Sequence, residues 1–552
     1  TLAGEFSAKT NYLFLTYHGS HDDVKPLGKK AVVVLGSGPY HIGSSVEFDW
    51  SSVMAARALV KNQKLSVVIN CNPETVSTDY DISSRLYFED LSFETVADIY
   101  EFENPYGVVI SMGGQRPNNL ARKMAKEGFK ILGTKAHNID RAEDRGKFSG
   151  LLDSLEISQP LWQSFSNFAE AKKFALNVGF PVLVRPSYVL SGSAMKVCFN
   201  TYELESFLEK AAGLGPEHPV TVSQFIENAK ELEFDGVAQN GEIVLWAISE
   251  HVENAGVHSG DATIVYPTQR VFSATERKIR ELSTKIAQAL EVSGPFNIQF
   301  LVKEHKPFVI EVNLRASRTF PLLSKAMDVN FAEVAVDAFF GKAKKYVGHY
   351  PKNVVVKSPQ FSFARLSGAD PILQVEMSST GEVAAFGDSY DEALLKSIMS
   401  SSRLVLENKT ALLSLGGQVN KEKFLPFARM LFDSGYKLYA TDSTAEYFLR
   451  QKIGCQMVKK VSQSQGAGKE NVAEIIQGKK CAFAVILSDY GKKKKLRHVE
   501  QIITDGYKIR RASVENNLPL FTDLHLARAF VRALCGLKMK DLKIKAYNEY
   551  EF

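Results

Sequence analysis

Apolar runs and amphipathic stretches alternate along most of this chain. The run Ala31–Leu35 is apolar at every position, which is typical of a strand that is buried on both faces. The pattern at 51–61 predicts a helix, and the runs at 65–69 and 108–111 predict two further strands. Because strands and helices alternate here, we expect a parallel α/β layer.

A second region, from about Asp140 to Gly341, shows the same two kinds of pattern. Its most regular part is a pair of strands that are separated by the polar turn Glu304–Lys306. The small residues Ser191–Ser193 predict a loop. We expect strands at 181–184 (ending in Arg185-Pro186), 220–224, 296–302 and 308–313, and an amphipathic helix at 274–290.

The last part of the chain resumes the alternation near Leu404. We interpret residues 342–403 as a connector, and the first 27 residues lack a clear period. The fold class that follows is α/β in more than one domain. In the last part we expect strands at 411–415, 437–440 and 481–487, a helix at 421–432 and a helix near the end of 514–534.

The strand pair at 296–313 carries the most informative chemistry. If its turn centres on His305, Gln299 lies opposite Glu311 and Asn297 lies opposite Asn313, and all four share one face. A carboxylate and carboxamide oxygens that converge on one face suit a hard cation such as Mg²⁺. The other face would meet a core with Phe300, Val302, Ile310 and Val312.

A polar sheet face that simply meets solvent is the alternative for this pair of strands. Arg315 and Arg318 follow the second strand directly, and guanidinium groups clamp the oxygens of a transferring phosphoryl group. Arg145 and Arg185 are candidates for further phosphate contacts. The loop Ser191–Ser193 would let backbone N–H groups approach phosphate closely. Together these residues favour a phosphoryl-transfer site.

Three other segments carry weaker signals. Glu231 and Glu233 follow a predicted strand, and either could accept hydrogen bonds from ribose hydroxyls or simply be solvated. His251 and His258 lie in a segment that is dense in polar residues and reads as a binding loop. Glycines at 36, 38 and 43 fit a tight strand-to-helix turn better than a dinucleotide fingerprint, although an anion site stays open.

Composition narrows the class of protein. The net charge is +5, from 67 basic and 62 acidic residues, so charge gives no reason to expect a nucleic-acid or membrane partner. No run of about 18 apolar residues predicts a transmembrane helix. Five scattered cysteines favour a reducing compartment over a disulfide framework. The chain begins with Thr1, so we expect a fragment or a processed product.

Several long motifs, in order, resemble the large chain of carbamoyl-phosphate synthetases over nearly the whole sequence. Two of them, RAEDR and HVENAGVHSGDA, resemble the second, carbamate-phosphorylating half in particular, and AGEFSAKTNYLFLTYHG resembles the end of the oligomerisation region that precedes it. The motifs are GSGPYHIGSSVEFDW, NCNPETVSTDYD, IDRAEDRGKF, RPSYVLSGSAM, ISEHVENAGVHSGDA, GPFNIQF and EVNLRASRTFP.

The resemblance implies a division of the chain and a set of site residues. The domains would be the end of an oligomerisation region (1–27), a Rossmann-like pre-ATP-grasp domain (28–137), an ATP-grasp domain (138–342), a connector (343–403) and a methylglyoxal-synthase-like regulatory domain (404–552). Metal ligands would be Gln299, Glu311 and Asn313, and Arg315 and Arg318 would hold the reacting phosphate. ATP would contact Arg145, Arg185, Gln224, Ile226, Glu231, Gly256, Val257, His258 and Ser259, with potassium near Glu231, His251 and Glu253.

The regulatory region departs from the family's bacterial pattern. The resemblance places effector phosphate on Lys421, Thr441, Thr444 and Lys460. At the next strand end Leu487-Ser488-Asp489 replaces the family's Asn-Thr-Thr, and an acid there would repel a nucleotide phosphate. Ser358 stands where the bacterial family has a glutamate that binds ornithine. We therefore expect a small-molecule effector other than ornithine.

The function that the resemblance implies is phosphorylation of carbamate by ATP with Mg²⁺ or Mn²⁺, in arginine, urea or pyrimidine synthesis in the cytoplasm or mitochondrion. The partners implied are a first synthetase half and a glutaminase, both absent from this chain, and further copies in a homo-oligomer. Two alternatives stay open. One is another ATP-grasp carboxylase or ligase, and the other is a regulatory or assembly fragment without activity.

Overall fold

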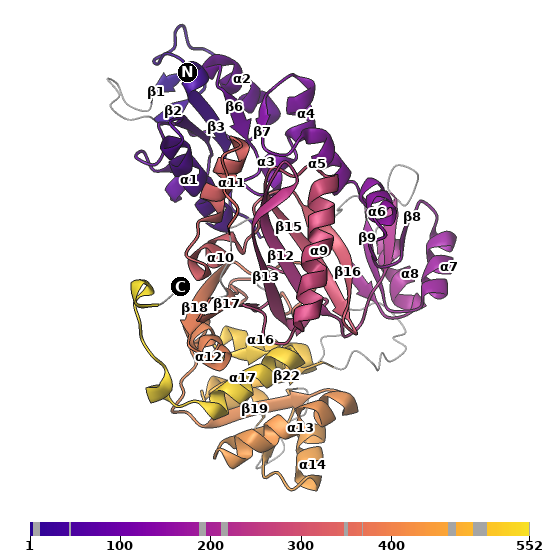
Figure 1. Cartoon of the computed structure of the whole chain (residues 1–552). Helices are drawn as coiled ribbons and strands as arrows, with labels where there is room; N and C mark the ends of the chain where they lie inside the picture. The colour runs from indigo at the N-terminus through magenta and orange to yellow at the C-terminus, as the bar shows by residue number, and fades with distance from the viewer. Residues whose placement is uncertain are drawn as a thin grey trace. The chain divides into compact units, whose positions relative to one another are not determined.

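The computed structural model describes residues 1–3, 12–42, 46–186, 195–210, 219–346, 351–366, 368–461, 471–488 and 505–550 (Figure 1). The chain forms two compact units. The first unit comprises Thr1–Glu250 and Tyr266–Pro351, and the second comprises His251–Val265 and Lys352–Glu551. Among the described residues, no helix is long and apolar enough to cross a membrane.

The first unit begins with a seven-stranded sheet in the order β1-β2-β5-β4-β3-β6-β7. Its interior strand β3 (Ala31–Leu35) is buried throughout and pairs in parallel with β4 and β6, so the predicted parallel layer is confirmed. The aperiodic leading segment also joins this sheet, because β2 pairs with β5. The other strands are β1 (Leu2–Ala3), β2 (Tyr12–Phe14), β4 (Leu65–Ile69), β5 (Arg85–Tyr87), β6 (Gly107–Val109) and β7 (Ile131–Leu132). The helices are α1 (Val46–Lys61), α2 (Phe93–Glu103), α3 (Gln115–Asn118), α4 (Ala121–Lys126) and α5 (Ala136–Glu143).

A small antiparallel sheet in the order β10-β9-β11-β8 follows α6 (Arg145–Ser154). Arg185 lies inside β9, opposite Thr221 of β11, whereas the sequence pattern places it after the strand; the extra pairing with β11 extends the strand by two residues. The elements are β8 (Trp162–Phe165), α7 (Phe168–Val178), β9 (Val182–Pro186), β10 (Lys196–Cys198), α8 (Thr201–Lys210) and β11 (Val220–Gln224).

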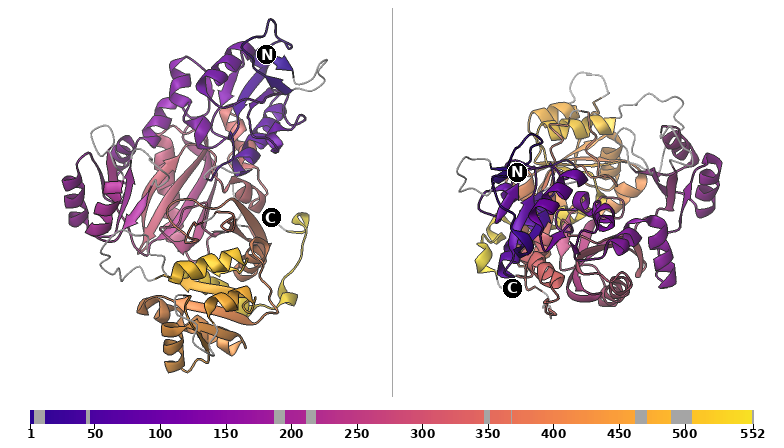
Figure 2. Two further views of the ribbon diagram at one scale, coloured as in Figure 1. Left: turned by 180° about the vertical axis from the view of Figure 1, so that it is seen from behind. Right: turned by 90° about the horizontal axis from the view of Figure 1, so that it is seen from above.

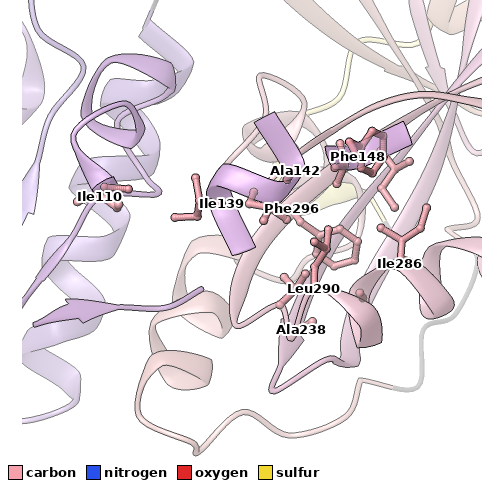
Figure 3. Close-up of a cluster of buried hydrophobic side chains, with 14 of the residues drawn as sticks. Ile110, Ile139, Ala142, Phe148, Ala238, Ile286, Leu290 and Phe296 are labelled. Carbon is pink, nitrogen blue, oxygen red and sulfur yellow. The ribbon is translucent and has the colours of Figure 1, made fainter. Parts of the chain in front are cut away.

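The third part of the first unit is a sheet in the order β16-β15-β12-β13. Helix α9 (Ser273–Ala289) lies on one face of these strands (Figure 1), and Figure 2 shows the strands from behind. Under α9, apolar side chains from β12, β15, α5 and α6 form one core (Figure 3). The remaining elements are β12 (Lys230–Gln239), β13 (Glu242–Asn254), β15 (Gly294–Lys303), β16 (Lys306–Asn313), α10 (Phe320–Ala326) and α11 (Phe331–Phe339).

The hairpin of β15 and β16 has the predicted polar pairs but a different turn. Lys303 pairs with Lys306, so the turn is Glu304-His305, with positive φ at both residues, rather than a loop centred on His305. A β-bulge between Gln299 and Phe300 shifts the register by one residue. Because of this shift Gln299 still lies opposite Glu311. The same shift puts Val309 in the core in place of Ile310, so our assignment of Ile310 to the core face is wrong.

The second unit contains the end of β13 with β14, β17 and β18 in that order, and a parallel sheet in the order β21-β20-β19-β22-β23. The interval that we interpret as a connector carries two of these strands and a helix, whose buried residues pack on the same core as the parallel sheet. The elements are β14 (Ile264–Tyr266), β17 (Val354–Gln360), β18 (Gly381–Gly387), α12 (Tyr390–Ser401), β19 (Thr410–Leu415), α13 (Gln418–Asp433), β20 (Lys437–Thr441), α14 (Asp442–Arg450), β21 (Gln456–Val458), α15 (Val472–Gln477), β22 (Phe483–Leu487), α16 (Asp505–Glu515), β23 (Leu520–Phe521) and α17 (Leu524–Gly536).

Candidate active site

Polar side chains form two transverse rows across β12, β15 and β16, which we call the polar ladder. The first row is Glu233, Gln299 and Glu311, and the second is Asp235, Asn297 and Asn313; the members of each row are directly paired in the strand register. Paired residues lie on the same face of a sheet. The opposite face carries Phe234, Ile298, Phe300 and Val312, which belong to the core under α9.

The chemistry of the ladder is oxygen-rich. Asn313 Nδ2 donates to Glu311 Oε1 over 3.1 Å, and Gln299 stands directly beside that carboxylate. Within the described residues, no group of three His, Cys, Asp or Glu forms a metal cluster. Gln299, Glu311 and Asn313 supply one carboxylate and two carboxamides. Such a set suits an ion such as Mg²⁺, which takes its remaining ligands from phosphates and water. These residues fit such a cation.

Arg315 is half-buried, and all three of its guanidinium nitrogens donate to other groups of the protein. Its guanidinium donates to Gln115 Oε1 at 2.9 Å, to Asn313 Oδ1 at 3.2 Å and to the carbonyl of Ala316 at 3.1 Å. Gln115 belongs to α3, so this arginine ties the first sheet of the unit to the ladder. Burial lowers the pKa of Arg315, and the carboxylate of Glu311 raises it in part. Arg315 is therefore built into the site as a fixed positive charge.

Arg318 differs from Arg315 in having hydrogen-bonding capacity to spare. Within the part of the chain that the structure describes, its Nη2 atom is buried and has no hydrogen-bond partner. Its guanidinium carbon lies 5.8 Å from the centre of the Phe48 ring, and that of Arg315 lies 5.5 Å from the same ring. A guanidinium that is oriented by a ring and keeps a free N–H can accept a new anionic partner. Arg318 is thus the better placed of the two to bind phosphate.

Arg145 approaches the ladder from α6. Its Nη1 atom donates to the carbonyl of Ile310 at 2.7 Å, and its guanidinium carbon lies 5.1 Å from the centre of the Trp162 ring. Burial lowers the pKa of Arg145, repulsion from Arg185 lowers it further, and Glu311 raises it. Arg145 is thus close enough to Arg185 and Glu311 to be influenced by both charges. Arg185 itself is exposed, and its Nε contacts Met195 Sδ at 3.1 Å.

Three of the residues assigned to ATP, Gln224, Ile226 and Glu231, lie where the chain passes from the small sheet to the large one. Gln224 ends β11 and its backbone N–H donates to the carbonyl of Leu161 at 2.7 Å. Gln224 and Ile226 are both half-buried, and the chain enters β12 four residues later. Glu231 is buried on β12, opposite Leu301 and on the ladder face. Gln224, Ile226 and Glu231 thus lie between the end of β11 and the start of β12, the strand that carries Glu233 and Asp235.

Asp235 is the member of the ladder that our sequence analysis missed. It is fully buried, and burial together with repulsion from Glu233 raises its pKa to about 7. The available signal was the period-two spacing of Glu231, Glu233 and Asp235, since alternate residues of a strand share a face. That signal alone could not show which face of which sheet they occupy.

The other residues assigned to ATP and potassium lie in the second unit. The loop that follows β13 is held by Asp261, whose carboxylate accepts from the backbone N–H groups of Ser378 and Ser379 at 2.8 Å each. Lys357 Nζ donates to the carbonyls of Ser259 and Gly260 at 3.3 Å. The loop 256–259, which includes Gly256, Val257 and His258, is therefore fixed by its own unit. His251 and Glu253 are buried at the end of β13.

The threonines assigned to the effector site serve the interior of the parallel sheet. Thr441 Oγ1 donates to Ser414 Oγ at 3.0 Å, and Thr444 Oγ1 accepts from the backbone N–H of Leu415 at 2.9 Å. Both threonines are buried. Lys421 lies on α13 and Lys460 just after β21, and both are half-buried. The hydroxyls of the two threonines thus have structural partners.

The bond from Leu415 to Thr444 yields a stability prediction. We expect Thr444→Val to lower the free energy of unfolding of the second unit by about 1–3 kcal/mol, because the buried N–H of Leu415 loses its acceptor. Urea unfolding, followed by far-UV circular dichroism, measures the change. Thr444→Ser is the control and should be close to the parent chain. An unchanged unfolding curve for the valine variant contradicts the prediction.

Some residues named in our sequence analysis lie outside the described part of the chain. They are the loop Ser191–Ser193, Gly43 and Asp489. The described part of the glycine segment is a tight turn, as expected. Gly38 has a φ of +71° and its backbone N–H donates to Asn70 Oδ1 at 2.9 Å. A Cβ on Gly36 would lie 2.5 Å from Asn70 Cγ, so close packing requires glycine there.

Comparison with protein families finds three matching domain models along the chain, two of which fall mainly in the first compact unit. Residues 28–141 match the carbamoyl phosphate synthase preATP-grasp domain, and 144–343 match the ATP binding domain of the carbamoyl-phosphate synthase L chain. Residues 423–522 match the MGS-like domain. The ladder and its arginines lie within the second match.

Solved structures share the fold at low identity. The biotin carboxylase domain of Hydrogenobacter thermophilus 2-oxoglutarate carboxylase, in complex with MgADP and bicarbonate, has a TM-score of 0.53, 14% identity, and covers 67% of this chain and 89% of that one. An N5-carboxyaminoimidazole ribonucleotide synthetase has a TM-score of 0.52 and 11% identity, over 68% of this chain and 97% of that one. These likenesses show an ATP-grasp fold.

Curated relatives match along almost the full chain. The multifunctional protein pyr1-3 of Dictyostelium discoideum is 48% identical over 543 residues, which are 98% of this chain and 24% of that protein. The mitochondrial carbamoyl-phosphate synthase [ammonia] of Rattus norvegicus is 43% identical over 560 residues, 100% of this chain and 37% of that protein. The chain thus spans between about a quarter and two fifths of these relatives. Because two carbamoyl-phosphate synthase domain models and an MGS-like domain model match in succession, the chain belongs to the carbamoyl-phosphate synthase large-chain family.

Proposed function

We propose that this chain transfers the γ-phosphoryl group of ATP to carbamate and forms carbamoyl phosphate and ADP. The observation that carries the proposal is the polar ladder with Arg318 beside it. A row of metal-binding oxygens next to a guanidinium with a free N–H suits a substrate that carries several phosphate charges. The family membership supports carbamate as the acceptor.

The residues of the first unit divide the work of binding. Gln224 and Ile226 border the base of the nucleotide, and Glu231 accepts from its ribose hydroxyls. Gln299, Glu311 and Asn313 would hold Mg²⁺, or Mn²⁺ in its place. When bound, the cation neutralises charge on the phosphate oxygens and fixes their orientation. Potassium near Glu231, His251 and Glu253 is a further part of the proposal.

The transfer needs no nucleophilic side chain. A carbamate oxygen attacks the γ-phosphorus, the bond from that phosphorus to the β–γ bridging oxygen breaks, and ADP leaves with the bond's electron pair. Arg318 and Arg185 bind the transferring oxygens, whose charge grows more diffuse during the transfer. Arg145 and Arg315 place two positive charges near the carboxylate of Glu311. Closure of the loop Ser191–Ser193 over the phosphates stays a prediction.

The larger assembly is also part of the proposal. The relatives are longer than this chain, so we propose that a first synthetase half and a glutaminase supply carbamate, and that the chain works in a homo-oligomer. The division into 1–27, 28–137, 138–342, 343–403 and 404–552 is proposed as the functional one. Lys421, Thr441, Thr444 and Lys460 remain the proposed effector residues.

The second unit contains a cavity of 510 Å³ beside Ser358. Ser358 is buried and its Oγ lies 2.8 Å from Ser397 Oγ. A hydroxyl in this position carries no negative charge for a cationic amino group. Because Glu253 and Asp261 also line this cavity, our proposal that ornithine is not the effector rests on position 358 alone.

The reverse partial reaction tests the proposed function without any partner. We expect the 552-residue chain, given MgADP and carbamoyl phosphate, to form ATP, which a luciferase assay measures. Excess EDTA during the reaction should abolish ATP formation, because the polar ladder has no positive charge of its own to hold the phosphates; Mg²⁺ is restored after the reaction is stopped, since luciferase itself requires it. An adenylate kinase inhibitor and omission of carbamoyl phosphate are the controls. A folded chain that binds MgADP yet forms no ATP would overturn the proposal.

A further inference from the structure

Asp235 is a buried carboxylate that the reaction as derived does not use. It is fully buried on β12, in the second row of the polar ladder. Both of its oxygens are engaged: Oδ1 accepts from Asn297 Nδ2 at 2.9 Å, and Oδ2 accepts from Thr319 Oγ1 at 2.6 Å. Such a group is costly to bury, and burial raises its pKa accordingly. The position therefore needs an explanation beyond filling the core.

Its partner Thr319 directly follows Arg318. Thr319 is the N-cap residue of α10, yet its side chain makes no capping hydrogen bond to that helix. A threonine in this position would ordinarily accept from a backbone N–H of the first turn. Here the hydroxyl donates to Asp235 instead. The segment that carries both site arginines is thus anchored to β12 and not to the helix it precedes.

Ser317 adds a second anchor on the other side of Arg318. Its Oγ lies 2.8 Å from Thr319 Oγ1, so it joins the hydroxyl that donates to Asp235. Ser317 and Thr319 are both buried. Upstream, the backbone N–H of Ala316 donates to the carbonyl of Ser111 at 2.8 Å. Arg318 is therefore flanked on both sides by hydroxyls of one hydrogen-bonded network, which ends on the carboxylate of Asp235.

We infer that Asp235 is a positioning residue for phosphoryl transfer: through Thr319 and Ser317 it fixes the backbone on both sides of Arg318, and through Asn297 it fixes the second row of the polar ladder. The inference rests on the proposed function of the same site. Its physical basis is that a displacement of about 1 Å in a phosphate-binding group costs about 10²-fold in rate. The hydroxyl pair holds the arginine against such a displacement.

A matched pair of variants at one position tests this inference. Thr319→Val keeps the branched shape but removes the hydroxyl, and Thr319→Ser keeps the hydroxyl. For ATP formation from MgADP and carbamoyl phosphate, we expect Thr319→Val to lower kcat by about 10²-fold and to change the calorimetric Kd of MgADP by less than about 3-fold. Thr319→Ser should retain kcat within about 3-fold. Thermal unfolding of each variant shows whether it is folded.

The outcomes separate this inference from the proposed function. If the parent chain makes no ATP, the proposed function fails. If the parent is active and Thr319→Val matches it in kcat, the positioning role is overturned. Equal losses of kcat in both variants, with a lowered unfolding temperature, would show a merely structural role and also overturn it. If Thr319→Val does not fold, Ser317→Ala decides by the same criterion, with an expected loss of about 10-fold in kcat.

Discussion

Replacing Glu311 with alanine is expected to lower the rate of ATP formation from MgADP and carbamoyl phosphate by about 10²- to 10³-fold. Glu311 is the only carboxylate among the three proposed metal ligands. It lies opposite Gln299, and Asn313 Nδ2 donates to its Oε1. Its removal leaves two neutral carboxamides, which bind a dehydration-resistant cation such as Mg²⁺ weakly. Raising the Mg²⁺ concentration should recover part of the lost activity.

The fold should survive this change. Glu311 is only half-buried, and the core face of β16 is formed by Val309 and Val312. Glu242→Ala, at an exposed strand position in the same sheet, is the matched control and should be fully active. Thermal unfolding of both variants should resemble that of the parent. A Glu311→Ala chain with the parent's rate and Mg²⁺ dependence would reject the metal assignment.

Arg318→Lys is expected to lower kcat by about 10²- to 10³-fold while leaving the fold intact, which corresponds to a loss of about 3–4 kcal/mol in transition-state stabilisation. Lysine keeps the charge but presents a single ammonium group in place of a planar fork of N–H donors. The buried Nη2 atom, which has no hydrogen-bond partner among the described residues, is the donor that lysine cannot supply. Steady-state kinetics of ATP formation measure the effect.

Arg315→Lys should behave differently, and this contrast makes the prediction specific. The guanidinium of Arg315 already donates hydrogen bonds to Gln115, to Asn313 and to the carbonyl of Ala316. Its replacement should lower the unfolding temperature of the first unit as well as the rate. Arg277→Lys, on the exposed side of α9, is the silent control. If Arg318→Lys retains more than half of the parent kcat, Arg318 does not bind the transferring phosphoryl group.

The two arginines show what a linear motif can and cannot predict. Their presence directly after β16 already predicted phosphate chemistry, because guanidinium groups beside a face proposed to hold a cation suit a phosphorylated substrate. Their separate roles depend on contacts with residues far away in sequence. Arg315 meets Gln115, 200 residues away, and Arg318 is flanked by hydroxyls that meet Asp235, 84 residues from Thr319. A pattern within a short segment cannot predict contacts between residues that are so far apart in sequence.

For the hairpin of β15 and β16, the predicted residue pairs are correct, but the turn geometry from which we predicted them is not. We placed the turn at His305 and obtained the correct partners for Gln299 and Asn297. The structure reaches these partners through a two-residue turn and a bulge at the base of the polar rows. A bulge depends on how the strand fits its neighbours, so it leaves no clear trace in the alternation of residue types.

The sequence by itself determined several local elements, such as the strand Ala31–Leu35 and the helix at 273–289, because a continuous apolar run and a helical period are each typical of one regular structure. It also determined that a carboxylate, carboxamides and arginines are close along the chain. Only the tertiary structure decided that β12 lies beside β15 and brings Asp235 to the site, and that residues 343–403 contribute strands and a helix. The reason is that strand partners are selected by the burial of whole faces, a property of surfaces assembled from distant segments.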